Sequence, residues 1–157
     1  MAAHSAGILL YRITASGPEV WLGHMGGPFW SRKQERAWSI PKGEAEPGEG
    51  DLEVARREFE EELGVPAPDL GYDELGTYRY SSGKTVTVFV AEAPAFELPE
   101  LRSGTFDLEW PPRSGRTQAF PELDEARWAP LDAARGLLVA GQLPVLDALE
   151  ARLAARR

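Results

Sequence analysis

The segment from residue 43 to residue 65, GEAEPGEGDLEVARREFEEELGV, constrains the fold of this chain more than any other stretch. Its apolar residues recur at i, i+3, i+7 and i+11, which is the spacing of one buried stripe on a helix. They are Leu52, Ala55, Phe59 and Leu63. Gly64 suits the left-handed residue that ends a helix, and Pro66 cannot continue one. The pattern therefore predicts a helix from about Asp51 to Leu63, preceded by a glycine-rich loop.

Three glutamates of this helix share one edge of it, because residues three and four apart lie on the same face. They are Glu58, Glu61 and Glu62. Each like-charge contact would disfavour the helix by about 0.2 to 0.5 kcal/mol. A cation bound by the three carboxylates would remove this repulsion, so the cluster is a candidate metal site. Ligands that offer only oxygen favour Mg2+ or Mn2+ over zinc. The backbone carbonyl of Gly43, in the preceding loop, is the best candidate for a further ligand.

Four other charged residues of the segment have weaker assignments. Arg57 projects beside Glu61, where it either fixes that carboxylate as a partner behind the metal or forms an ordinary i,i+4 surface pair. Glu49 precedes the helix and is either a loop anchor or an outer metal ligand. Glu53 and Glu60 lie on the far side of the helix and are predicted to be solvated surface acids.

Length and composition indicate one intracellular domain. The chain has 157 residues and 43% hydrophobic content, which supports one core, so residues 1–157 are predicted to form a single domain. It has no cysteine, which excludes disulfides and thiolate chemistry and suits the cytoplasm. No signal peptide is evident, nor a run near the roughly 20 apolar residues that a membrane span needs. A soluble, cytoplasmic monomer or homodimer is therefore expected.

The formal net charge of −8 argues against a protein that coats nucleic-acid polymers, because affinity for the phosphate backbone depends on accumulated lysine and arginine. An anionic substrate would have to be recruited locally, by a metal ion and by the few basic residues around it. We therefore expect a small-molecule partner and neither a nucleic-acid polymer nor a membrane.

Short strands and helices surround this segment. Strands are predicted at 5–12, 20–25, 38–41, 77–81, 85–93, 106–110 and 126–129, and further helices at 131–138 and 143–153. The two strands at 77–93 form a hairpin that turns at Ser82 and Gly83, with Val86, Val88 and Val90 on one side. This mixture predicts an α/β fold with a mixed sheet between helical layers.

Two segments, 26–37 and 101–120, fit neither pattern well and mix aromatic with basic residues. Loops of this length are usually functional or disordered, and these would supply stacking surfaces for a base and cations for phosphates. Structural roles are the alternative, and Trp38 is the strongest candidate for one. His24 is predicted to be a strand residue rather than a ligand. Phosphate-loop, dinucleotide-fold, serine-hydrolase and zincin motifs are absent from the sequence.

The spacings G-x5-E-x7-R-E-apolar-x-E-E-x-G-apolar within the segment resemble the complete signature of the Nudix hydrolase superfamily. The matching residues are Gly43, Glu49, Arg57, Glu58, Glu61, Glu62 and Gly64, with Phe59 and Val65 in the apolar slots. The chain looks most like small predicted nucleoside-triphosphate pyrophosphohydrolases and, more distantly, diadenosine tetraphosphate hydrolases. WSIPKGEAEPGE (38–49), GKTVTVFVAE (83–92) and PELDEARW (121–128) carry that likeness.

The resemblance implies a Nudix-type α/β/α sandwich and a set of residue roles. Glu58, Glu61 and Glu62 would hold metal ions together with the Gly43 carbonyl, and Glu58 is a candidate general base. Glu122 stands six residues before a tryptophan, which is similar to an added metal ligand or base of the diadenosine enzymes. Glu125 is the competing candidate.

Substrate-binding residues are expected near this site. Lys42, beside the glycine-rich loop, and one of Arg32, Lys33 or Arg36 would bind the outgoing polyphosphate. Tyr78, Tyr80 or Lys84 would reach it from the hairpin. The predicted function is a Mg2+-dependent pyrophosphohydrolase, with Mn2+ as an alternative ion, that cleaves a phosphoanhydride bond in a dinucleoside polyphosphate or a nucleoside triphosphate. A nucleotide-binding or sensing module without catalysis is the alternative. Isoprenoid diphosphate isomerisation is disfavoured by the missing cysteine.

Overall fold

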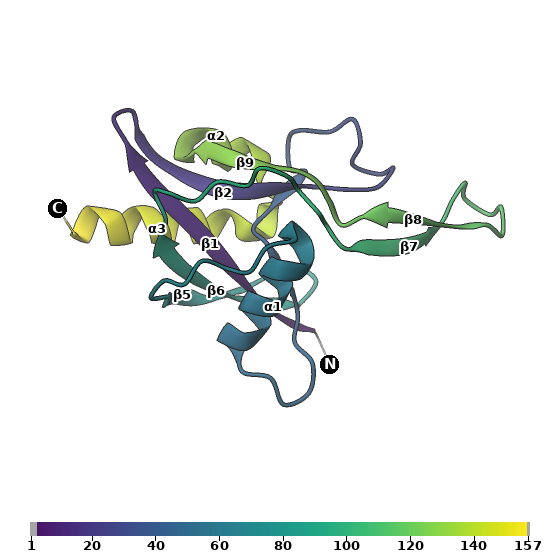
Figure 1. Ribbon diagram of the computed structural model, residues 1–157, viewed down its shortest axis with the longest axis horizontal. Coiled ribbons are helices and arrows are strands. Elements are labelled where there is room, and N and C mark those ends of the chain that lie inside the picture. The colour runs from purple at the N-terminus through teal and green to yellow at the C-terminus, as the bar shows by residue number, and fades with distance from the viewer. Residues whose placement is uncertain (1–2, 157) are drawn as a thin grey trace.

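The central element is a mixed β-sheet with helices on both faces, seen in a computed structural model that describes residues 3–156 (Figure 1). The strand order β3-β2-β1-β6-β5 runs across it, β4 pairs with β1, and β9 pairs with β2. These strands are β1 (His4–Thr14), β2 (Gly17–Met25), β3 (Trp38–Ser39), β4 (Lys42–Glu44), β5 (Asp73–Arg79), β6 (Thr85–Glu92) and β9 (Leu123–Pro130). β1 runs parallel to β6, and the other pairs in this sheet are antiparallel.

The helices are α1 (Asp51–Leu63), α2 (Leu131–Leu137) and α3 (Leu143–Ala155), with a 3-10 turn η1 (Ala140–Gln142) before α3. A separate hairpin is formed by β7 (Thr105–Glu109) and β8 (Thr117–Pro121). It projects from the body on the side opposite to the C-terminus (Figure 1).

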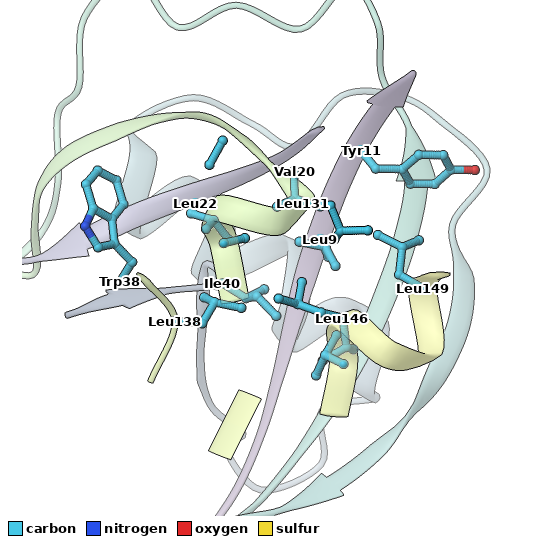
Figure 2. Packing of buried hydrophobic residues seen from close by; sticks show 14 of the residues in the cluster. Leu9, Tyr11, Val20, Leu22, Trp38, Ile40, Leu131, Leu138, Leu146 and Leu149 are labelled. Atoms are coloured by element: carbon cyan, nitrogen blue, oxygen red, sulfur yellow. The ribbon is translucent and has the colours of Figure 1, made fainter. Parts of the chain in front are cut away.

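Alternation along the strands builds two cores, one on each face of the sheet. Ala6, Ile8 and Leu10 of β1 pack with the apolar stripe of α1, while Leu9 and Tyr11 face the other way. This is the period of two that a strand buried on both faces requires. Figure 2 shows the second core, where Leu9 lies with Leu146 and Leu149 of α3. Both predicted layers, and hence the α/β/α sandwich, are confirmed.

Several element boundaries differ from the predictions. β5 begins at Asp73, four residues earlier than expected, and strand β8 was not predicted. Only Trp38–Ser39 of the stretch expected as one strand at 38–41 forms a strand, β3, which pairs with β2. Strand β4 begins at Lys42, runs into the segment expected to be the glycine-rich loop, and pairs with β1. The turn at Gly83 is confirmed by its positive φ of 92°, and Val86, Val88 and Val90 lie in one core as predicted. Within residues 3–156, no helix is long and apolar enough to cross a membrane.

Candidate active site

Helix α1 is fixed at both ends and along one face. Gly50 is the N-cap, and its backbone N–H donates to Glu53 at 3.3 Å. Gly64 adopts the predicted left-handed conformation, with φ of 82°, and its N–H donates to the Glu60 carbonyl. The stripe residues Ala55, Phe59 and Leu63 are fully buried. The stripe sets the rotation of the helix, and this rotation turns the neighbouring acidic edge toward β4.

Glu58 lies directly against the backbone of Gly43. A Cβ atom at residue 43 would stand 2.0 Å from the carboxyl carbon of Glu58, so only glycine permits this approach. Glu58 is 9% exposed. Burial raises the pKa of the Glu58 carboxyl, repulsion by Glu61 adds to this rise, and the bond from Arg57 opposes it. The carboxyl group predicted to be a ligand therefore lies against residue 43, whose carbonyl is another predicted ligand, but its negative charge is disfavoured.

Glu62 is buried one turn further along the helix, with 8% of its surface exposed. Its Oε1 accepts a hydrogen bond from the Lys42 backbone N–H at 3.2 Å. Burial raises the pKa of Glu62 to about 8, against the attraction of the Lys42 ammonium, and the charges of Glu122 and Glu58 raise it further. Two neighbouring carboxyl groups thus have little access to water and repel each other.

Arg57 binds carboxylates from both the loop and the helix. Its Nε and Nη2 donate to the two oxygens of Glu49 at 2.9 and 2.8 Å, and its Nη1 donates to Glu58 at 2.8 Å and to Glu61 at 3.3 Å. The bond from Arg57 lowers the pKa of Glu49 to about 2. Glu49 also accepts from the Glu46 N–H at 2.8 Å. Glu49 therefore has the geometry of a loop anchor. It makes two short hydrogen bonds with Arg57, whereas Glu61, the predicted i,i+4 partner, makes one longer bond.

The donor set fits a hard divalent cation. In the part of the chain that the structure describes, no three acidic or histidine side chains already converge as a metal cluster. Arg57 holds Glu58 and Glu61 by the same nitrogen, and the Glu61 side chain is 55% exposed. Nevertheless, two buried carboxylates beside a glycine backbone offer only oxygen ligands, and a cation would offset the cost of burying their charge. The residues present therefore fit Mg2+ or Mn2+.

A cleft opens beside these carboxylates. One part of about 210 Å³ is lined by Glu62 and Glu122, with Phe106 on its wall. A second part of about 350 Å³ shares Lys42 and Trp30 with the first and continues to Tyr80. Lys42 therefore lies where the two parts meet. Glu122 faces the same cleft as Glu62, whereas its competitor Glu125 is exposed and lies within 4 Å of Arg127.

Gln142 supports the second part of the cleft and was not predicted. It is fully buried, donates to the Tyr80 hydroxyl and the Ser39 Oγ at 3.0 Å each, and accepts from the Ile40 N–H at 2.9 Å. These contacts link positions that are 62 to 103 residues apart in the sequence. No local sequence signal distinguishes such a glutamine from a surface residue at the start of a helix.

The predicted substrate-binding residues are only partly brought together. Lys42 lines both parts of the cleft. Tyr78 packs against the core beneath α3, and Lys84 points toward Glu44, 4.0 Å away. Arg32 is exposed on the 26–37 loop. None of these three lines the cleft among the described residues, and their role in substrate binding stays a prediction.

Two predictions of structural roles are confirmed. Trp38 is fully buried. His24 is a buried residue of β2 whose ring nitrogens contact Asp124 at 2.7 Å and the Lys33 carbonyl at 2.6 Å. His24 thereby ties the 26–37 loop to β9, beside the cleft.

Solved structures with this arrangement share the fold at low sequence identity. An Ap4A hydrolase binary complex from C. elegans has a TM-score of 0.70 and 22% identity, covering 98% of this chain and 99% of that chain. The NUDIX domain of Shewanella oneidensis NrtR complexed with ADP ribose has a TM-score of 0.67 and 15% identity, covering 98% and 89%. These likenesses show the fold.

Curated relatives match a shorter stretch. The asymmetrical bis(5'-nucleosyl)-tetraphosphatase of Sus scrofa is 39% identical over 66 residues, covering 39% of this chain and 45% of that protein. The protein of the same name from Rattus norvegicus is 40% identical over 70 residues, covering 41% and 47%. The chain thus spans about half the length of the curated relatives it matches. A family model described as the NUDIX domain matches residues 3–149. This match covers nearly the whole chain, and the chain therefore belongs to the Nudix family.

Proposed function

We propose that this protein is a Mg2+-dependent pyrophosphohydrolase that cleaves a phosphoanhydride bond in a nucleoside diphosphate-linked substrate. The observation that carries the proposal is a pair of buried carboxyl groups one helical turn apart: Glu58 packs against the Gly43 backbone, and Glu62 lines the cleft. Burying two carboxylate charges costs free energy in a protein without a cation, and a bound cation offsets that cost. Mn2+ is the alternative ion.

Glu58, Glu61 and Glu62 would hold the metal with the Gly43 carbonyl, and Glu122, which lines the same cleft as Glu62, would join them. When bound, such an ion neutralises phosphate oxygens and makes a water molecule more acidic. Arg57 would keep Glu58 and Glu61 in position, since its Nη1 already donates to both. Lys42 would bind phosphate oxygens from the junction of the two parts of the cleft.

A carboxylate must take the proton from the attacking water. Glu58 and Glu122 are the two candidates. Glu58 is the more buried, and its proton affinity is raised by that burial. Glu122 is half-buried and faces the cleft without a direct bond to Arg57. A pH profile of kcat for each glutamine variant would separate the two roles.

Dinucleoside tetraphosphates are the substrates to test first, because the curated relatives are named as asymmetrical bis(5'-nucleosyl)-tetraphosphatases. Nucleoside triphosphates are the second class. The test is a turnover panel in millimolar Mg2+ with diadenosine polyphosphates, ordinary and oxidised nucleoside triphosphates, ADP-ribose and nucleotide sugars, resolved by anion-exchange chromatography. We expect equal amounts of AMP and ATP from diadenosine tetraphosphate.

Two variants of helix α1 test whether the hydrolysis depends on the carboxylates of the site. Glu61→Gln removes an exposed carboxylate of the site, so the fold should persist while activity falls about 10^2-fold or more. Glu60→Gln makes the same chemical change at an exposed position outside the site and should keep full activity. If no substrate turns over but a nucleotide raises the Tm, the protein is a binding or sensing module and the hydrolase proposal is wrong.

A further inference from the structure

The β7–β8 hairpin, hereafter the arm, adds little to either core. Among the described residues its two strands pair only with each other, in a register from Thr105 opposite Pro121 to Glu109 opposite Thr117. Figure 1 shows the arm extending away from the sheet, on the same side of the body as the 26–37 loop. A two-stranded hairpin alone is at best marginally stable in water. The arm therefore needs a further contact to be stable, and because it is exposed, a ligand could bind to it.

One face of the arm is aromatic. Phe106 and Leu108 of β7, and Trp110 directly after it, alternate with exposed polar residues, so they lie on one face of the arm. The ring of Trp110 meets the ring of Phe29 edge to face, with centroids 5.5 Å apart. Phe29, on the 26–37 loop, is 57% exposed. Phe29 and Trp110 form a ring pair open to solvent, which we call the aromatic platform.

The tip of the arm is a hydrogen-bonded turn that presents two arginines. The Gly115 N–H donates to Glu109 at 2.9 Å and the Ser114 N–H to the Pro111 carbonyl at 3.1 Å. Arg113 and Arg116 are exposed, and within residues 3–156 neither has a carboxylate at ion-pair distance. In a chain of net charge −8, most arginines of the body are paired with acids. The tip therefore presents two arginines that form no ion pair within the described residues, next to the Glu109 carboxylate that accepts from Gly115.

The base of the arm is part of the candidate active site. Phe106 lines the cleft together with Glu62 and Glu122. The backbone of Gly27 approaches the same ring, leaving no room for a side chain there. Trp110 stands four residues along the strand, about 13 Å from Phe106. The carboxylates thus lie between two regions: the cleft that leads to Tyr80, and the arm that leads to the platform and the arginines.

From this arrangement we propose that the arm is a second nucleotide subsite, which takes the distal nucleoside of a dinucleoside polyphosphate. The distal base stacks on the aromatic platform, and the phosphates nearest to it pair with Arg113 and Arg116. Base stacking on aromatic rings tolerates any base, and arginine binds phosphate oxygens in pairs. The inference rests on the proposed function and deepens it, because a mononucleotide has no second nucleoside to place there.

The test compares two substrates on one set of variants. In the shortened-arm variant, Asn-Gly replaces Asp107–Ala119, because Phe106 and Phe120 are cross-strand partners that a two-residue turn can connect. Trp110→Ala removes the platform, and Trp110→Phe keeps an aromatic face. Arg116→Ala removes charge at the tip. Arg156→Ala makes the same charge change directly after α3, whose C-terminal end lies on the side of the body opposite to the arm (Figure 1). Circular dichroism and thermal melting verify that each variant folds.

We expect the shortened-arm variant and Trp110→Ala to raise KM for diadenosine tetraphosphate about tenfold, with KM for ATP and both kcat values unchanged. Trp110→Phe and Arg156→Ala should behave as the unmodified protein, and Arg116→Ala should raise only the dinucleotide KM. Equal changes for both substrates, or none, overturn the inference. So does an effect confined to a 5'-triphosphorylated oligonucleotide, which would make the arm a contact for RNA.

A binding measurement separates this inference from the proposed function. Diadenosine tetraphosphate is titrated calorimetrically into Glu61→Gln protein, with and without the shortened arm. If the unmodified protein hydrolyses nothing but the shortened arm still weakens binding about tenfold, the proposed function fails and the subsite stands. If hydrolysis is observed and the arm changes neither binding nor KM, the subsite fails and the proposed function stands.

Discussion

The charge on Glu62 is predicted to destabilise the metal-free protein, and Glu62→Gln should remove that cost. Burial raises the pKa of this carboxyl from 4.5 to about 8. Between these two pH values the unfolded chain releases the proton while the folded chain retains it, so the unfolded state binds fewer protons. Stability therefore falls as pH rises from about 4.5 to about 8, and levels off above that.

The size of the effect follows from the shift. Each pKa unit corresponds to about 1.4 kcal/mol, so full ionisation costs at most about 5 kcal/mol. Near pH 5 the cost is under about 1 kcal/mol, and near pH 9 it is almost complete. Glutamine keeps an oxygen for the Lys42 N–H and adds an amide with its own burial cost, which does not change with pH. The stability of the variant relative to the unmodified protein should rise by about 4 kcal/mol from pH 5 to pH 9.

Urea unfolding in EDTA, at intervals from about pH 5 to pH 9, measures this difference as a free energy of unfolding. Glu60→Gln is the matched control, since Glu60 is exposed on the same helix. Adding Mg2+ should flatten the pH dependence of the unmodified protein, because the bound cation favours the ionised carboxylate. A difference that stays constant within about 1 kcal/mol over this range would show that burial of the Glu62 charge carries no such cost.

Substitutions at three residues, two of them with a control variant, test the site further. Gly43→Ala places a Cβ atom 2.0 Å from the Glu58 carboxyl carbon and should lower kcat about 10^2-fold, whereas Gly71→Ala, at an open position, should not; steady-state kinetics decides. Arg57→Ala frees Glu49 and Glu58 and should raise the Mg2+ concentration for half-maximal rate about 10- to 100-fold. Arg57→Lys should not restore it, because one ammonium cannot replace the guanidinium fork, and a normal Mg2+ titration would contradict this. Glu122→Gln should remove the acid limb of the kcat profile if Glu122 is the base, and an unchanged limb leaves that role to Glu58.

The parts of the fold that depend on local spacing were predictable. Helix α1 begins and ends where its stripe and Gly64 place it, and the β5–β6 hairpin turns at Gly83. Strand β8 was missed because nearly all of its residues are exposed and no alternation marks a buried face. The first half of β5 was missed for a related reason, since a register irregularity between Glu74 and Gly76 interrupts its pattern.

Local spacing likewise predicts only part of the candidate site. Glu58, Glu61 and Glu62 share a helix edge, and helical spacing alone predicts that. The burial of Glu58 and Glu62, however, depends on β4 and on residue 43, and the exposure of Glu61 depends on the absence of such a neighbour. The contact between Gln142 and Tyr80 joins segments 62 residues apart in sequence. No periodicity specifies such a contact, because it is formed by the tertiary fold.

We propose that the α1 carboxylates act through a divalent cation on a phosphoanhydride bond. The decisive measurement is the initial rate of diadenosine tetraphosphate hydrolysis as a function of free Mg2+, for the unmodified protein and for Glu58→Gln. We predict no hydrolysis in EDTA, a saturable rise with Mg2+, and a loss of about 10^2-fold or more in the variant at every Mg2+ concentration. Hydrolysis that persists in EDTA, or a variant that matches the unmodified protein, would contradict the claim.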